Sequence, residues 1–353
     1  MPRPELIVLV HNIRSAYNVG SIFRTADGAG VSGGVTVVCV DFGSTFTKAS
    51  VVDLAEGRIV AAAEHRPDKA RSLEQRFGVA CATDYDSVLE DPQVDLVCIA
   101  TDFYLKRSLI QKAVACGKHV LVDKPLCRTM REAREIVLAA EGSRVKILLS
   151  YPLRFQASLA KLALAVRSGE YGTVASYVHH SIRQYPEGDL MAYVSYPTPA
   201  RINGGGELMN LGSHPVDYLY SVFGCPQRVY CRMENLFWDE YQAFGTEDMA
   251  TLLCDYGTFS ALVVTGRSKV RKELPAVNAL DVACEGRWIR VDDDRYTING
   301  EAVEVPSAPL SPRESCVQHL IDCIVHNAEP RTGVHNGLAV AEIVTAAYQS
   351  ARS

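Results

Sequence analysis

The chain has 353 residues, of which 48% are hydrophobic and 22% charged, and its formal net charge is −5. This length exceeds a typical single core, so two domains are expected. The acidic balance argues against a nucleic-acid partner. No apolar run reaches the roughly 18 residues that a membrane span needs, so no membrane association is expected.

The eleven cysteines form no CxxC pair and no Cys/His cluster at zinc spacing. Several lie inside apolar runs, as Cys98 and Cys254 do, where a buried free thiol is the expected state. The apolar run near the N-terminus spans about five residues, which is short for the core of a secretory signal. We therefore expect a reduced, cytoplasmic protein without a metal site.

Between about residues 59 and 150, short apolar runs alternate with helical periodicity. The predicted strands are 58–65, 95–102, 119–126 and 145–151. Three helices are predicted between these strands. The first begins at Pro67, and the second carries the apolar positions Leu105, Leu109, Ala113 and Val114. The third begins at the capping box Thr129–Glu132. Strands that alternate with helices, and that lack polar alternation, predict an open parallel α/β sheet.

After residue 150, strands follow one another with few helices between them. The predicted strands are 173–182, 227–233, 248–256, 259–267, 279–286 and 287–293. The predicted helices are 157–167, 212–223 and two that begin near residues 312 and 337. This order predicts an α+β domain with a mostly antiparallel sheet. The expected division is an N-terminal extension at 1–33, a Rossmann-like domain at 34–150 and the α+β domain at 151–353.

Three residues could support hydride transfer from an alcohol carbon. This reaction needs a group that removes the hydroxyl proton and a cation or donor that holds the oxygen. Lys124 follows a predicted parallel strand, where open α/β sheets bind their ligands. His214 carries an imidazole, which exchanges protons near neutral pH. Asn210 lies four residues earlier and shares a helix face with His214 if the segment is helical, so it could orient the imidazole or hold a substrate.

Other polar residues have two readings each. Arg154 could hold a substrate hydroxyl or carboxylate, or it could form a structural salt bridge. Glu64 ends the second predicted strand and suits ribose hydroxyls, whereas His65 and Arg66 could attract a 2′-phosphate. The run of three glycines at 204–206 allows backbone to approach a ligand or cofactor closely.

Several ordered motifs over residues 64–353 resemble the Gfo/Idh/MocA family of NAD(P)-dependent sugar and cyclitol oxidoreductases. They include GKHVLVDKPL, SYPLRFQASLAKL and GGGELMNLGSHPVDYLYSVFG. The resemblance implies hydride transfer between NAD or NADP and a hydroxyl or carbonyl carbon, no metal, and a homodimer or homotetramer. It implies catalytic roles for Lys124, His214 and Asn210, although aspartate is the family's usual residue at position 210. It implies substrate contacts by Arg154, Asn210 and His214, and cofactor contacts by Gly43, Ser44, Glu64, Thr101, Asp123 and Lys124.

The expected glycine fingerprint GxGxxG is altered to DFGSTFTKAS after residue 40. Of its three glycines only Gly43 remains, with Asp41 and Phe46 at the other two positions. A carboxylate repels a pyrophosphate and a phenylalanine crowds the helix, although Ser44 and its neighbours offer donors. Weakened dinucleotide affinity follows, and the alternative function is an inactive binding or scaffold protein of the same fold.

Two N-terminal fragments resemble other families. Residues 35–61 are similar to the first phosphate loop of actin-like ATPases and sugar kinases. Residues 8–31 are similar to the first motif of SpoU-type RNA methyltransferases, through Asn12, Arg14, Asn18, Gly20 and Arg24. The later motifs that either family needs are missing from the sequence. The sequence therefore argues against an ATP-hydrolysing or RNA-modifying enzyme, and an amphipathic helical extension is favoured for the first residues.

Overall fold

The structure is a computed structural model, and it falls into two compact units that are described separately. The residues that it describes are 8–9, 39–41, 62–64, 67, 70–71, 74–75, 81–92, 94–99, 103–186, 203–270, 277–292 and 295–353. The first unit comprises Met1–Cys127, Arg131–Tyr151 and Arg313–Gly337, and the second comprises Arg128–Met130, Pro152–Pro312 and Leu338–Ser353. The boundaries expected at residues 33 and 150 remain predictions.

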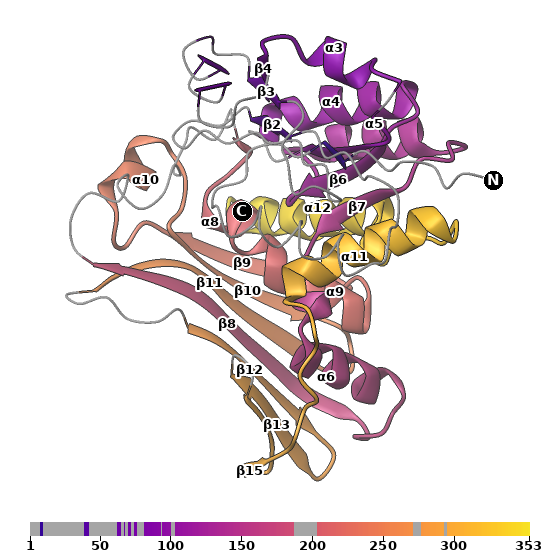
Figure 1. The fold of residues 1–353 in the computed structure, drawn as a ribbon. Coiled ribbons are helices and arrows are strands. Elements are labelled where there is room, and N and C mark those ends of the chain that lie inside the picture. Colours follow the sequence, from indigo (N-terminus) through magenta and orange to yellow (C-terminus); the bar gives the residue numbers. More distant parts are fainter. Residues whose placement is uncertain are drawn as a thin grey trace. The chain divides into compact units, whose positions relative to one another are not determined.

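The described residues of the first unit form a parallel sheet of seven strands (Figure 1). The strands are β1 (Val8–Leu9), β2 (Cys39–Asp41), β3 (Ala62–Glu64), β4 (Cys81–Ala82), β5 (Leu96–Ile99), β6 (His119–Asp123) and β7 (Ile147–Ser150). Their order is β4-β3-β2-β5-β6-β7, and β1 also pairs with β5. Every pair is parallel, which confirms the predicted fold class for this unit.

The strand order places a topological switch between β2 and β5, because the chain runs outward to β4 on one side and to β7 on the other. Open α/β sheets bind ligands outside the carboxyl ends of their strands at such a point. The register aligns Asp41 of β2 with Glu64 of β3, and Asp123 of β6 with Ser150 of β7. Glu64 and Asp123 thus both end their strands at the edge where a ligand is expected.

The helices of the first unit for which the structure gives both ends are α3 (Tyr85–Leu89), α4 (Phe103–Ala115), α5 (Met130–Ala140) and α11 (Pro312–Val325). In α4, Ala113 is buried, whereas the apolar residues Leu105 and Leu109 are partly exposed. The buried residues of α4 are Phe103, Lys106, Ile110 and Ala113. A lysine therefore occupies a core-facing position, which hides the true face from a reading of hydrophobic periodicity.

The second unit contains an eight-stranded sheet in the order β15-β14-β13-β12-β8-β11-β10-β9. The strands are β8 (Val174–Pro186), β9 (Arg228–Glu234), β10 (Met249–Asp255), β11 (Ser260–Val270), β12 (Val277–Cys284), β13 (Arg287–Asp292), β14 (Arg295–Ile298) and β15 (Glu301–Ala302). All pairs are antiparallel except β8 with β11, which confirms the mostly antiparallel sheet. The helices in its described residues are η1 (Pro152–Phe155), α6 (Ala157–Arg167), α8 (Glu207–Asn210), α9 (Ser213–Phe223), α10 (Asp239–Ala243) and the part of α12 (Val334–Ser350) from Leu338 onward.

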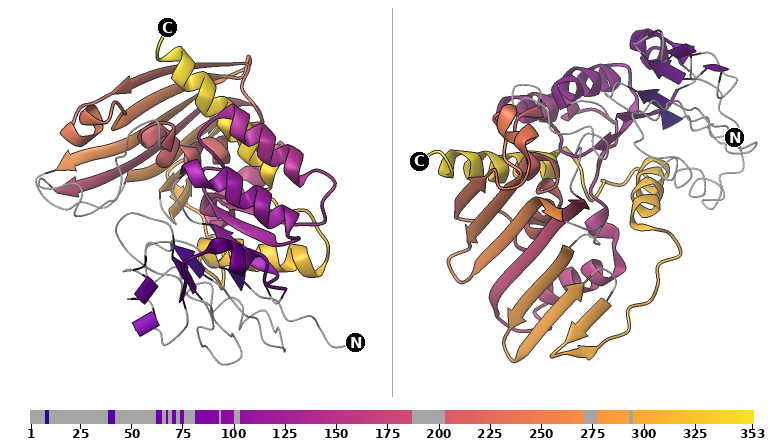
Figure 2. Two further views of the ribbon diagram at one scale, coloured as in Figure 1. Left: turned by 90° about the horizontal axis from the view of Figure 1, so that it is seen from above. Right: turned by 90° about the vertical axis from the view of Figure 1, so that its left-hand side faces the viewer.

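One face of this sheet forms the core of the second unit, and the unit's helices lie on that side (Figure 2). Side chains in register across the central strands alternate between buried and partly exposed. Tyr177, Ala261 and Cys254 form one buried row. His179, Val263 and Leu252 form the next. This period of two is the signature of a sheet that is covered on one face.

Two further features of the described residues bear on the sequence predictions. The cysteines whose side chains the structure describes are all free thiols. Within the described ranges, no helix combines the length and the hydropathy that crossing a lipid bilayer requires.

His179 should make the stability of the second unit depend on pH. Burial lowers its pKa to about 4, and the ring nitrogens bond the Tyr177 hydroxyl (3.0 Å) and the Asn278 side-chain oxygen (3.3 Å). The unfolded chain binds a proton near pH 6.5 and the folded chain does not, so stability falls as pH drops from 6.5 toward 4.

Relative to His179→Gln, the native chain should lose about 2 kcal/mol of its free energy of unfolding between pH 7 and pH 5. Urea denaturation of both proteins at the two pH values measures this difference. An equal loss in both proteins would contradict the assignment.

Candidate active site

The predicted site residues divide between the two units. In the first unit, Asp123 ends β6 and Lys124 follows it, joined to Pro125 by a cis peptide bond. Glu64 ends β3. In the second unit, Arg154 lies in η1, Asn210 ends α8 and His214 lies in the first turn of α9. Gly43, Ser44 and Thr101 lie outside the described residues.

A buried lysine that the sequence analysis did not single out holds the segment around Lys124. The ammonium group of Lys106 donates to the main-chain carbonyl oxygens of Asp123 (2.5 Å) and Pro125 (2.8 Å). Its side chain is completely buried, 4.6 Å from the centre of the Phe103 ring. One charged group therefore binds the peptide group before Lys124 and the peptide group after Pro125, and so holds the Lys124–Pro125 segment at both ends.

The three glycines at 204–206 are required by neighbours within the second unit. A Cβ atom on Gly204, which has φ of +83°, would lie 2.8 Å from the Arg128 carbonyl oxygen. One on Gly205 would lie 1.9 Å from the Tyr348 hydroxyl, and one on Gly206 would lie 2.2 Å from the Glu247 carbonyl oxygen. The groups that lie close to these three glycines are thus other parts of the protein, namely Arg128, Tyr348 and Glu247.

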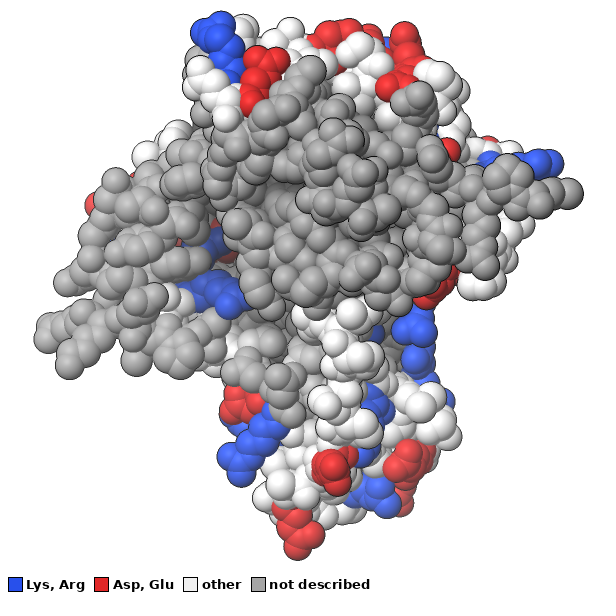
Figure 3. Space-filling model, in the orientation of Figure 1, with Lys and Arg blue, Asp and Glu red and all other residues white. Residues whose placement is uncertain are grey.

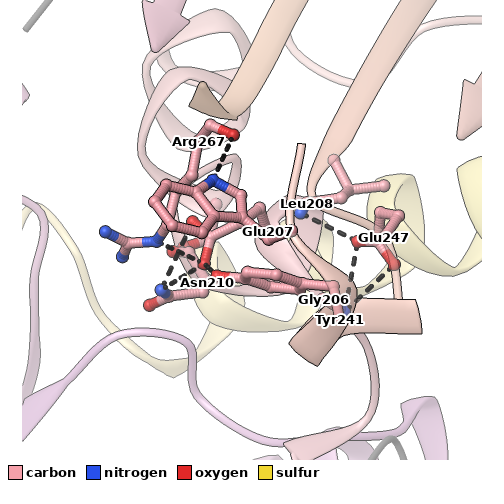
Figure 4. Close-up of polar contacts among 9 residues, drawn as sticks. Gly206, Glu207, Leu208, Asn210, Tyr241, Glu247 and Arg267 are labelled. Atoms are coloured by element: carbon pink, nitrogen blue, oxygen red, sulfur yellow. Dashed lines mark hydrogen bonds and ion pairs between the residues drawn. The ribbon is translucent and has the colours of Figure 1, made fainter. Parts of the chain in front are cut away.

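Glu247 anchors the start of α8 (Figure 4). Its carboxylate accepts hydrogen bonds from the main-chain nitrogens of Gly206 (3.1 Å) and Leu208 (3.0 Å) and from the Tyr348 hydroxyl (2.7 Å). Burial raises the pKa of this carboxyl group, and the hydrogen bonds oppose that shift. The N–H groups at the start of a helix have no partner within the helix, so this carboxylate satisfies them and fixes where α8 begins.

Glu207 points in another direction and forms a buried network with three side chains (Figure 4). Its carboxylate lies 2.7 Å from the Arg267 guanidinium and accepts a hydrogen bond from the Tyr241 hydroxyl. It also accepts one from the side-chain nitrogen of Asn210, at 3.2 Å. The amide nitrogen of Asn210 is therefore directed at Glu207, and the carbonyl oxygen of the same amide is directed away from that carboxylate.

The backbone from Asn210 to His214 follows a helical path. Leu211 and Gly212 both have right-handed helical torsion angles, and the His214 N–H donates to the Leu211 carbonyl oxygen at 3.1 Å. The Ser213 hydroxyl donates to the Asn210 carbonyl oxygen at 2.9 Å. Residues four apart on such a path lie on neighbouring parts of one face. The backbone between Asn210 and His214 is therefore helical, as sharing a face requires. The roles of the two side chains remain predictions.

Arg154 forms a structural salt bridge, which was one of the two roles predicted for it. Its Nε and Nη2 atoms donate to the two carboxylate oxygens of Asp217 at 2.7 and 2.6 Å. Asp217 is completely buried, which raises its pKa to about 6, and Arg154 opposes the shift. This bidentate geometry connects η1 to α9. A substrate contact by Arg154 remains a prediction.

The Glu207–Arg267 pair should be strongly coupled, because removing one partner of a buried ion pair leaves the other charge uncompensated. We expect Glu207→Gln or Arg267→Met alone to lower the free energy of unfolding by about 3–5 kcal/mol. The double variant should lose clearly less than the sum of the two. Denaturant unfolding of the four proteins in this cycle measures the coupling. Additive losses would show that the two side chains act independently.

Comparisons with known proteins agree with this architecture. Residues 35–151 match a family described as "Oxidoreductase family, NAD-binding Rossmann fold", and residues 159–302 match the "GFO/IDH/MocA C-terminal domain". D-apiose dehydrogenase from Paraburkholderia graminis is 27% identical over 319 residues, which cover 85% of this chain and 82% of that protein. Levoglucosan dehydrogenase from Pseudarthrobacter phenanthrenivorans is 26% identical over 171 residues, and this match spans only 44% of its length.

Solved structures share the fold. The aldose-aldose oxidoreductase from Caulobacter crescentus superimposes with a TM-score of 0.75 at 21% identity, over 99% of this chain and 98% of that one. A levoglucosan dehydrogenase in complex with NADH and levoglucosan gives a TM-score of 0.78 at 17% identity, over 99% and 97%.

The matches also bear on the two N-terminal fragments. The Rossmann match begins at residue 35 and so includes the kinase-like segment 35–61, whose separate resemblance gains no support. The methyltransferase-like segment 8–31 precedes the match, and Val8–Leu9 within it pair with β5. The two matched domains follow one another over most of the chain. The chain therefore belongs to the Gfo/Idh/MocA family of oxidoreductases and has an NAD-binding Rossmann domain.

Proposed function

We propose that the chain transfers a hydride between NAD or NADP and a hydroxyl or carbonyl carbon of a sugar or cyclitol. The observation that carries the proposal is that the two predicted catalytic segments are each held by buried charged side chains, Lys106 for Lys124 and Glu207 for Asn210. Rigid support of this kind is what a catalytic constellation requires. The dehydrogenases and reductases among the relatives support a carbohydrate substrate.

The described residues of the first unit fit a dinucleotide. The sheet has its switch point between β2 and β5, and Glu64 ends the strand next to β2, where an acidic residue can accept hydrogen bonds from ribose hydroxyls. Asp123 ends β6 at the same edge, and Lys124 follows it. Gly43, Ser44 and Thr101 would complete the contacts. Asp41 ends β2, where the altered loop begins. Because a carboxylate repels a pyrophosphate, we expect this loop to bind the dinucleotide weakly.

Each of the proposed catalytic side chains has a separate task. When bound, the nicotinamide ring supplies or accepts the hydride. Lys124 donates a hydrogen bond to the reacting oxygen and stabilises negative charge on it. The imidazole of His214 takes the hydroxyl proton in oxidation and returns it in reduction. Asn210 presents its amide oxygen, because its amide nitrogen is directed at Glu207, and so orients the imidazole or a substrate hydroxyl.

The inactive scaffold that the altered loop suggested is not supported by the relatives, which include dehydrogenases and reductases.

Lys124→Met should abolish turnover, because methionine keeps the length of the side chain but donates no hydrogen bond. We expect a loss of kcat of about 100-fold or more, with the thermal unfolding midpoint within a few degrees of the native value. The assay follows nicotinamide absorbance with a panel of aldoses, anhydrosugars and cyclitols. A substrate that the native and variant proteins turn over equally fast would rule out the assigned role.

We also propose a homo-oligomer that forms through the face of the second unit's sheet opposite the buried rows. One row across four strands on that face is apolar and consists of Tyr230, Leu253, Leu262 and Val178. Tyr230 is 52% exposed and Leu253 is 40% exposed. On the described part of the surface in Figure 3, by comparison, acidic and basic side chains are interspersed.

Leu253→Arg should therefore shift the native dimer or tetramer toward a smaller species, because it places a charge in the middle of the row. Leu138→Arg is the matched control, since Leu138 is 65% exposed on α5 in the other unit. Light scattering after gel filtration measures the masses. A native protein that is monomeric at micromolar concentration, or a Leu253→Arg variant of unchanged mass, would refute the proposed interface.

A further inference from the structure

Lys106 is a completely buried lysine in the helix α4, which precedes β6 in the first unit. Burying an ammonium group carries a large desolvation cost unless hydrogen bonds replace its water. The carbonyl oxygens of Asp123 and Pro125 supply two such bonds, at 2.5 and 2.8 Å, and the ring of Phe103 lies 4.6 Å away. The sheet and the helix could be packed with an apolar side chain at this position, as they are at Ile110 one turn later.

The two carbonyl groups that Lys106 binds belong to the residues directly before and after Lys124. Each bond to a charged donor is stronger than a bond between neutral groups. Together they hold the Asp123–Lys124 peptide group and the Pro125–Leu126 peptide group, so the Lys124–Pro125 segment between them is anchored at both ends and a displacement of Lys124 strains at least one of the two bonds. Apolar packing could not do this, because it lacks directional contact with the carbonyl groups.

We propose that Lys106 is a positioning residue that sets the place and direction from which Lys124 reaches the reacting oxygen. This inference rests on the proposed function of Lys124. Lys106 does not touch the substrate. It acts through the backbone of the Asp123–Pro125 segment, and a displacement of about 1 Å at such a position can cost on the order of 100-fold in rate.

The chain provides a matched control at the other end of the same strand. Lys118 precedes β6, is 7% exposed, and donates through its ammonium group to the Asp91 carbonyl oxygen at 2.6 Å. It is thus a second buried lysine that binds a main-chain carbonyl group in the same α4–β6 region. It lies at the amino end of β6, away from Lys124. A purely structural contribution should appear in variants of both lysines.

The test compares Lys106→Met with Lys118→Met in the full-length chain, with nicotinamide cofactor and the best substrate of the native enzyme. Methionine preserves the length and the apolar part of the side chain but removes the donors. We expect Lys106→Met to lower kcat by roughly 10- to 100-fold, with KM for the substrate and Kd for the cofactor changed less than about threefold. Lys118→Met should leave kcat within about threefold of the native value and lower the unfolding temperature.

Equal losses of kcat in both variants, or an unchanged kcat in Lys106→Met, would overturn the proposal. If the native enzyme turns over none of the sugars or cyclitols, the proposed function fails, and hydrogen exchange still tests the contact. Amide exchange in the peptide around residues 121–128 should then accelerate in Lys106→Met and not in Lys118→Met, whose effect should fall near residue 91. Unchanged exchange around Lys124 in Lys106→Met would overturn the proposal independently of any activity.

Discussion

The buried ion pair between Glu207 and Arg267 is the interaction on which the proposed catalytic segment of the second unit depends. The Glu207 carboxylate is completely buried, and the ion pair with Arg267 and the hydrogen bond from the Tyr241 hydroxyl group compensate for its lost hydration. Once it is held there, it directs the amide of Asn210. A second buried carboxylate, Glu247, fixes the start of the same short helix, and the glycines before it leave room for both groups. The orientation of Asn210 is therefore a consequence of electrostatics in the core.

The first unit uses a buried charge in a similar way but with the opposite sign. Lys106 binds carbonyl oxygens on both sides of Lys124, whereas in the second unit carboxylates bind amide and guanidinium donors. In each unit, burying an isolated charge would cost desolvation free energy. Polar groups in or beside the proposed catalytic segment compensate for that cost. The parallel sheet brings Glu64, Asp123 and Lys124 to its carboxyl edge, and the buried lysine determines how the last of them is presented.

The sequence predicted the fold well because the signals that set it are local and repeated. Runs of β-branched residues gave the strands, and the change after residue 150 from alternating helices to successive strands gave the second sheet. Lys124, Asn210 and His214 could be singled out because ordered motifs surround them. The core position of Lys106 in α4 was not predicted, because hydrophobic periodicity assigns such a position to an apolar residue. Glu207, Glu247 and Arg267 were missed, because their partners lie up to 101 residues away. The charge of Glu207 amid Leu208 and Met209 was the one available signal.

The central claim is that the first unit binds a nicotinamide dinucleotide despite its altered loop. Titrating the purified protein with NADH and with NADPH, followed by nicotinamide fluorescence, tests it most directly. Saturable binding of either cofactor, even at high micromolar affinity, with a matching rise in the unfolding temperature, is the predicted result. An absence of binding at millimolar concentrations of both would contradict the account, because the proposed roles of Lys124 and His214 require a hydride partner.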